Sequence, residues 1–198
     1  MEPFPPSPDA SLIVLPEDAA GDAPDVAAHA PAHAATARDV AALLPVMRLG
    51  ARWRDRIYEL PASQASGFDH ASIHALDTSD AAAFAAFANA CPETDRRAGQ
   101  VNLDDPLVIG WWERDRLLGA ASLLYPVPAV ADIGIMVHPQ ARRRGIAVHL
   151  VRQIAWLAVR MGKLVQYTAP EPNVASAGVA ERSGFALALL EEGLQTDW

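Results

Sequence analysis

Apolar residues recur with the period of a helix over one long segment in the second half of the chain. Within residues 145–161 they are spaced three or four positions apart, at Ile146, Leu150, Ile154, Leu157 and Met161. Polar and basic side chains fall on the opposite face, at His149, Arg152, Gln153 and Arg160. This spacing predicts an amphipathic helix. Gly162, directly after it, is well suited to end that helix.

Short apolar runs predict strands on both sides of this helix. We expect strands over residues 72–76, 107–112, 117–125, 130–137, 164–168 and 185–190, and further helices over residues 81–90 and 173–183. The strands over 107–112 and 117–125 form an antiparallel hairpin through a polar turn. The later strand–helix–strand order requires crossover connections and therefore a parallel pair. The pattern predicts an α/β fold whose mixed sheet carries helices on both faces.

The first third of the chain has a different character. Residues 1–35 are rich in Ala, Pro and Asp, so we expect a disordered or loosely attached leader. Residues 36–70 are expected to be an extension and linker, with a short helix over 36–49 and a strand over 56–60. The recognisable domain is expected over residues 71–198.

Composition narrows the classes of function. The net charge of −8 argues against nucleic-acid binding, which requires a basic surface. No apolar run reaches the ~20 residues that span a bilayer, and the N-terminus lacks the layout of a signal peptide. We therefore expect a cytoplasmic protein without a membrane partner. Cys91 is the single cysteine, which excludes an internal disulfide, and no histidine or carboxylate set has metal-ligand spacing.

Three consecutive arginines, Arg142, Arg143 and Arg144, are a local basic exception in this acidic chain. They lie between the strand that ends at Val137 and the helix that Gly145 opens. The first backbone amides of a helix lack intrahelical partners, and the helix dipole adds partial positive charge there. The turn is therefore expected to bind an anion, and a phosphate ester is the expected ligand.

The same residues carry a family resemblance. Arg142-x-x-Gly145-x-Ala147, preceded by Val-x-Pro, resembles the acyl-CoA-binding signature of the GNAT superfamily of N-acetyltransferases. A second block, Asn173-Val-Ala-Ser176 followed by residues 179–185, is similar to the closing pattern of that family. The resemblance implies the GNAT fold, a central mixed sheet of about six or seven strands with helices on both faces. It also implies acetyl-CoA or another acyl-CoA as the donor.

Site residues follow from the resemblance. The pyrophosphate would rest on the turn formed by Arg142, Arg143, Arg144, Gly145, Ile146 and Ala147. The pantetheine arm would run along the strand that ends at Met136 and Val137, hydrogen-bonded to their backbone. Asn173 and Ser176 are implied as polar contacts near the pantetheine or the sulfur. Asn173 is equally suited to cap a helix, and one side chain can serve both purposes.

Acyl transfer requires a neutral amine, a donor for the oxyanion and a proton for the departing thiolate. Asp132 lies on an apolar strand, where burial would raise its pKa, and in several relatives a carboxylate at this position acts as general base, often through water. A structural carboxylate held by backbone donors is the alternative. The family's general-acid tyrosine is Ala180 here, so Tyr167 is the candidate substitute, with packing as its other role. His138, beside the turn, is a candidate proton shuttle, although a histidine before proline is usually exposed.

The acceptor site is the least defined. Trp111 and Trp112 point to opposite faces of a strand, so one of them could line an acceptor pocket. The polar stretches 94–99 and 102–105 suit a cationic amine, with Asp104 and Asp105 as candidate contacts.

The sequence therefore predicts an N-acetyltransferase that acts directly on a small-molecule amine. The leader and residues 36–67 could cover the sheet, mediate formation of a homodimer or cap the acceptor site. A catalytically silent acyl-CoA-binding module is the alternative, which Ala180 keeps open.

Overall fold

The structure, a computed structural model, describes residues 49–67 and 70–196. The chain divides into two compact units, one of Met1–Asp55 with Leu190–Trp198 and one of Arg56–Leu189. Every site discussed below lies in the second unit. The leader expected over residues 1–35 and nearly all of the helix expected over 36–49 lie outside the described residues.

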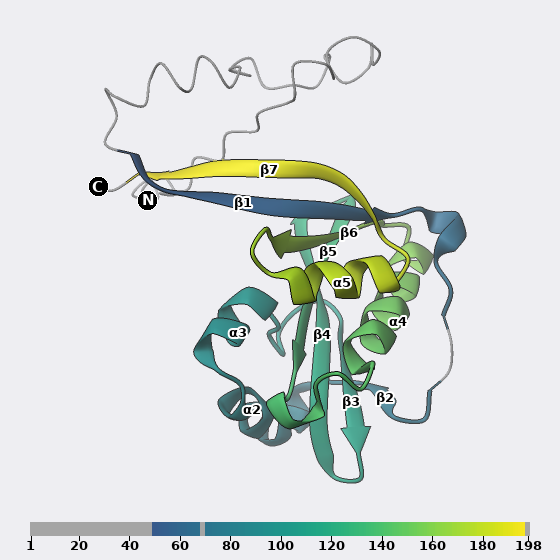
Figure 1. Cartoon of the computed structure of the whole chain (residues 1–198). Coiled ribbons are helices and arrows are strands. Elements are labelled where there is room, and N and C mark those ends of the chain that lie inside the picture. Colours follow the sequence, from purple (N-terminus) through teal and green to yellow (C-terminus); the bar gives the residue numbers. More distant parts are fainter. Residues whose placement is uncertain (1–48, 68–69, 197–198) are drawn as a thin grey trace, which may run out of the picture. The chain divides into compact units, whose positions relative to one another are not determined.

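The described strands form a seven-stranded sheet in the order β2-β3-β4-β5-β6-β1-β7 (Figure 1). Strands β2 to β5 pair antiparallel in sequence order, and β5 pairs parallel with β6. The mixed sheet predicted from the order of elements is therefore confirmed. The strands are β1 (Leu49–Leu60), β2 (Ile73–Ala75), β3 (Val108–Glu113), β4 (Arg116–Val127), β5 (Val130–Val137), β6 (Leu164–Pro170) and β7 (Ala186–Thr196).

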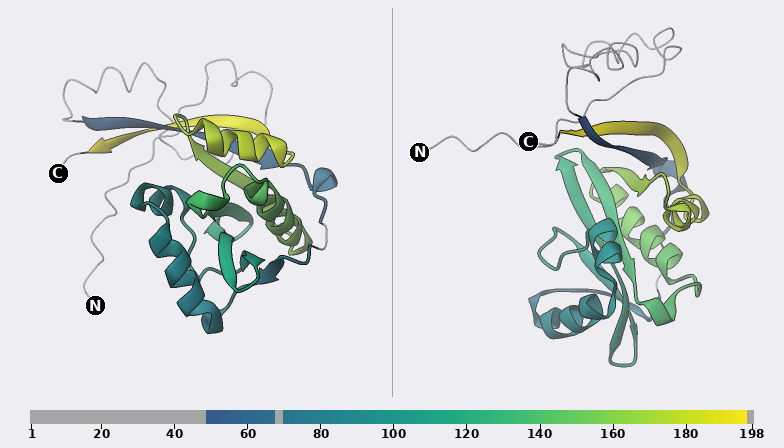
Figure 2. Two further views of the ribbon diagram at one scale, coloured as in Figure 1. Left: turned by 60° about the horizontal axis from the view of Figure 1, so that its bottom comes forward. Right: turned by 60° about the vertical axis from the view of Figure 1, so that its left-hand side comes forward.

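Helices cover both faces of this sheet, as predicted (Figure 1, Figure 2). Two of them, α2 (Ala81–Ala90) and α3 (Glu93–Gly99), lie on one face, and α4 (Ile146–Arg160) and α5 (Val174–Arg182) lie on the other. Short 3-10 turns η1 (Ala62–Gln64), η2 (Thr78–Asp80) and η3 (Pro139–Ala141) complete the chain path. No helix in the described ranges combines the length and the apolar character of a membrane span.

Helix α4 anchors the core on its face of the sheet. Its side chains Ile146, Leu150 and Ile154 are 0–2% exposed, and each contributes about 1.5–3 kcal/mol by burial. The predicted apolar stripe is therefore confirmed over these turns. Met161 was expected to continue it but is 51% exposed, because it is the C-cap residue and lies beyond the last helical turn.

Helix α3 was missed by the sequence analysis, which described residues 94–99 as a polar stretch and predicted no helix there. Its apolar content is too low to show a helical period, and Gly99 is its one buried residue. The local signals are electrostatic instead. Glu93 and Asp95 occupy the first turn, while Arg96 and Arg97 occupy the last, which suits the helix dipole.

The N-terminal boundary of the domain stays a prediction. The strand expected over residues 56–60 is confirmed as part of the longer strand β1, which lies between β6 and β7 in the sheet order. Residues expected to be extension and linker thus include a strand of the sheet.

Candidate active site

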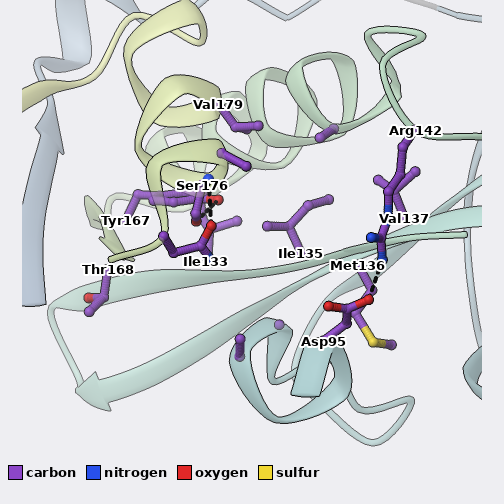
Figure 3. A pocket seen from close by; sticks show the side chains of 15 residues that line it. Asp95, Ile133, Ile135, Met136, Val137, Arg142, Tyr167, Thr168, Ser176 and Val179 are labelled. Atoms are coloured by element: carbon purple, nitrogen blue, oxygen red, sulfur yellow. Dashed lines mark hydrogen bonds and ion pairs between the residues drawn. The ribbon is translucent and has the colours of Figure 1, made fainter. Parts of the chain in front are cut away.

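A cleft opens where two central strands part. Strand β5 pairs with β6 through Val130↔Leu164, Ala131↔Val165 and Asp132↔Gln166, and in the described sheet this pairing ends at Asp132. On its other side β5 stays paired with β4 as far as Val137. The diverging strands enclose a cavity of about 300 Å³ (Figure 3).

Most of the predicted site residues lie around this one cavity. Its walls come from β5, β6, α5, the turn before α4, and α3. The predicted residues that line it are Met136, Val137, Arg142, Ala147, Tyr167, Asn173 and Ser176. The chain thus brings together two motifs that lie more than twenty-five residues apart in the sequence.

The turn before α4 presents exposed backbone and charge at one end of the cavity. Arg142, Arg143, Arg144 and Gly145 are all exposed, and Gly145 adopts a left-handed conformation (φ 83°) that favours glycine. The first helical hydrogen bond runs from the amide of His149 to the carbonyl of Gly145 (3.1 Å). The amides before it have no acceptor within the helix. The side chain of Ile146 is buried in the core, so this residue can offer a ligand its backbone alone.

Two of the three arginines already hold carboxylates. Arg142 forms an ion pair with Asp95 of α3, and Arg144 forms one with Glu113 of β3. The hydrogen bond from Arg144 lowers the pKa of Glu113, aided by the indole of Trp111. Asp95 and Arg142 both line the cavity (Figure 3). Sequence reasoning missed Asp95, because its partner lies 47 residues away and no local pattern joins them.

The other end of the cavity carries hydroxyl groups. The Tyr167 hydroxyl lies 2.9 Å from Ser176 Oγ, and the two side chains point toward each other (Figure 3). Burial raises the pKa of Tyr167 to about 12, so its phenol is protonated at neutral pH. Asn173 Oδ1 accepts from the Ser176 amide (3.0 Å), which confirms Asn173 as the cap of α5. Ala180, at the family's tyrosine position, is fully buried.

Asp132 stands at the apex of the cleft and does not line the cavity. Its Oδ1 accepts from the amides of Ile133 (2.9 Å) and Thr168 (3.1 Å), and its Oδ2 accepts from Thr168 Oγ1 (2.9 Å). Burial raises its pKa, as the sequence predicted, while the hydrogen bonds to the carboxylate act in the opposite direction. Its role as a general base stays a prediction.

Other candidates lie elsewhere. His138 was expected to be exposed but is 8% exposed, and its Nδ1 accepts from the Gln140 amide. It lines a second cavity of about 200 Å³, on the α2 side of the sheet. Trp111 and Trp112 belong to the cores on opposite faces, as predicted, and neither lines the first cavity.

The two acceptor candidates of the loop after α3 also lie away from the cavity. Asp104 is exposed, and Asp105 accepts from the amide of Asn102 (2.9 Å), so it closes its own turn. Cys91 is buried, which raises the pKa of its thiol. Within the described ranges, no three histidine, cysteine or carboxylate side chains are placed to hold a metal ion.

The fold is similar to solved structures of GNAT proteins. One from Novosphingobium aromaticivorans is 20% identical with a TM-score of 0.59, over 76% of this chain and 68% of that one. An acetyltransferase from Colwellia psychrerythraea is 20% identical with a TM-score of 0.61, over 80% and 61%. A GCN5-related N-acetyltransferase from Kribbella flavida is 14% identical with a TM-score of 0.52, over 76% and 60%. The chain thus spans about three fifths of the latter two.

The comparison with curated proteins found no match. The family model of the acetyltransferase (GNAT) family, in contrast, matches residues 70–185, a stretch that contains the cleft, the arginine turn and α5. The chain belongs to the GNAT acetyltransferase family.

Proposed function

We propose that this chain transfers an acetyl group from acetyl-CoA directly to the amine of a small molecule. Acyl transfer in general follows from membership of the family. The single observation that supports this assignment most is the continuity of the cavity, which joins the free edge of β5 to the exposed first turn of α4.

The cavity fits both parts of a CoA thioester. An edge of a strand offers backbone donors and acceptors to an extended ligand, and the pantetheine arm carries amides that can pair with them. Met136 and Val137 would supply that edge. The diphosphate would take the amides of Gly145, Ile146 and Ala147 together with the three preceding guanidinium groups. Because Arg142 pairs with Asp95, this ion pair would exchange for the phosphate.

The hydroxyl end of the cavity would receive the thioester. In the reaction the amine attacks the carbonyl carbon, the C–S bond breaks, and the thiolate takes a proton. With a pKa of about 12, Tyr167 is a much weaker acid than a thiol, whose pKa is about 8.5. Tyr167 and Ser176 therefore act best as hydrogen-bond donors near the sulfur or the oxyanion. The proton for the thiolate then comes from solvent or from the reacting amine.

Two observations favour a second candidate, a catalytically silent acyl-CoA-binding module. The tyrosine position is the buried Ala180, and the carboxylate of Asp132 is turned toward its own strands. Such a module would bind the donor without turnover.

Thiol release from acetyl-CoA, measured with a panel of small amines beside a calorimetric titration of acetyl-CoA, separates the two candidates. Turnover with one or more amines supports the enzyme. Binding without release for any amine supports the module, and the absence of binding contradicts both.

A further inference from the structure

The ladder between β5 and β6 ends where a side chain enters it. The last backbone pair of the ladder is Asp132↔Gln166. The amide of Ile133, directly after Asp132, and the amide of Thr168, two residues after Gln166, donate to one oxygen, Asp132 Oδ1. The Thr168 hydroxyl donates to the other oxygen at 2.9 Å. A carboxylate thus occupies the position in which backbone groups would continue the sheet.

The Asp132 carboxylate links β5 to β6 and also marks the point at which their backbones separate. Parallel strands lie about 4.8 Å apart when their amides and carbonyls pair directly. The carboxylate that accepts from the Thr168 amide takes the place of a backbone carbonyl of β5, so the next backbone rung does not form. Buried amides left without acceptors are costly. The Asp132 carboxylate removes that cost at the point where β5 and β6 separate, which we call the fork. The fork is therefore stable without a bound ligand.

The cavity begins directly after this point. Ile133 on one strand and Thr168 on the other are lining residues, whereas Asp132 itself is not. Beyond Ile133, the lining of β5 continues through Ile135, Met136 and Val137. The carboxylate is thus the last contact before the opening.

We propose that Asp132 is a positioning residue that holds β6 off β5, so that the edge of β5 stays open to the acyl-CoA arm. This inference rests on the proposed function for its ligand, but the fork itself is a property of the free protein. It assigns Asp132 a role other than proton transfer. A general base must lie within about 2.6–3.2 Å of the heavy atom that carries the proton, or reach it through one water, whereas both oxygens of Asp132 accept hydrogen bonds from the strands.

Substitutions at Asp132 separate the two roles. In Asp132→Asn the amide oxygen still accepts from both backbone amides, and the NH2 group donates to the Thr168 hydroxyl, which accepts as well as donates. Asp132→Asn therefore keeps the hydrogen bonds that link β5 and β6 and removes the carboxylate that could act as a base. In Asp132→Ala both are lost. Thr168→Val removes one hydrogen bond, and Thr168→Ser restores it. Asp115→Asn, an exposed carboxylate outside the acyl-CoA cavity, is the matched control.

Two measurements decide the matter. The first is amide hydrogen exchange of Ile133 and Thr168 in the free protein. We expect slow exchange in the wild type, Asp132→Asn and Asp115→Asn, and exchange at least tenfold faster in Asp132→Ala.

The second measurement determines KM and kcat for acetyl-CoA. We expect KM to rise about ten- to a hundredfold in Asp132→Ala, the size of lost hydrogen bonds to a charged group. Asp132→Asn should stay within about threefold of the wild type in both constants, with an unchanged acid limb of its pH profile.

The inference is overturned if Asp132→Asn loses turnover more than a hundredfold while its affinity for acetyl-CoA is kept, because that result identifies a base. It is also overturned if Asp132→Ala exchanges and binds like the wild type. Should Asp132→Ala not fold, Asp132→Ser takes its place, because a seryl hydroxyl is too short to accept from the Thr168 amide, and unchanged exchange at Thr168 would again contradict the fork. A wild-type protein that binds no acetyl-CoA refutes the proposed function, while the exchange rates still test the fork.

Discussion

The ion pair between Arg142 and Asp95 gives the sharpest test of the phosphate site. It places a carboxylate on a guanidinium that the diphosphate would need, at the mouth of the cavity. Replacing Asp95 by Asn keeps the shape of the side chain and removes its charge. Arg142 is then released, and acetyl-CoA should bind more tightly.

The solvent exposure of this ion pair sets the size of the expected change in affinity. The two side chains are 45% and 35% exposed, and ion pairs of this kind contribute about 0–1 kcal/mol. Asp95→Asn should therefore lower the Kd for acetyl-CoA by up to about fivefold. Arg142→Ala should raise the Kd about ten- to a hundredfold, because it removes a charge-assisted hydrogen bond to phosphate. In the Arg142→Ala background the benefit of Asp95→Asn should disappear.

Isothermal titration calorimetry of the four proteins, at low and at physiological salt, measures this cycle. The gain from Asp95→Asn should shrink as salt rises, since screening weakens the pair that competes with the ligand. Glu93→Gln is the matched control, because Glu93 is on the same helix and pairs with Arg97 outside the cavity. If Asp95→Asn weakens binding, or acts equally with and without Arg142, the exchange of carboxylate for phosphate is wrong.

Three further predictions concern stability and the hydroxyl end of the cavity. Gly145→Ala should cost about 1–2 kcal/mol in urea unfolding, because φ is 83° there, and equal stability would contradict a strained turn. Gly134→Ala should cost about 1–3 kcal/mol, because its Cβ would lie 2.6 Å from the Gly99 carbonyl oxygen; Gly178→Ala, inside α5 beside a flexible arginine, should not destabilise. Tyr167 has a folded pKa of about 12, above its unfolded value near 10, so its contribution to stability, about 2–3 kcal/mol, is complete below pH 10 and is lost as pH rises through 12. Between pH 9 and 11.5 the stability of the wild type relative to Tyr167→Phe should fall by about 2 kcal/mol, and a constant difference would contradict the shift.

The strand–turn–helix unit at the heart of the site could be predicted from the sequence. The apolar run of β5, the glycine of the turn and the 3.6-residue period of α4 are local patterns, and each is recognised within one element. The capping role of Asn173 is local as well, because its partner is three residues away.

The cleft, the ion pairs of the arginine turn and the burial of His138 depend on contacts between distant segments. The cleft exists because β5 and β6 part at Asp132, whose partner Thr168 is 36 residues away. The charge balance of the arginine turn depends on Asp95 and Glu113, 47 and 31 residues from their partners. His138 was expected to be exposed because proline follows it, but it is 8% exposed and lines a cavity together with residues of α2. Sequence periodicity carries no signal for such pairings.

The central claim is that the first turn of α4 and the open edge of β5 together bind acetyl-CoA. A titration of the 15N-labelled protein with acetyl-CoA, followed by backbone amide chemical shifts, tests it most directly. The claim predicts that the largest shifts fall on the amides of Gly145, Ile146 and Ala147 and on those of Met136 and Val137, and saturate together with one dissociation constant. Shifts confined to other parts of the chain, or none at all, would contradict it.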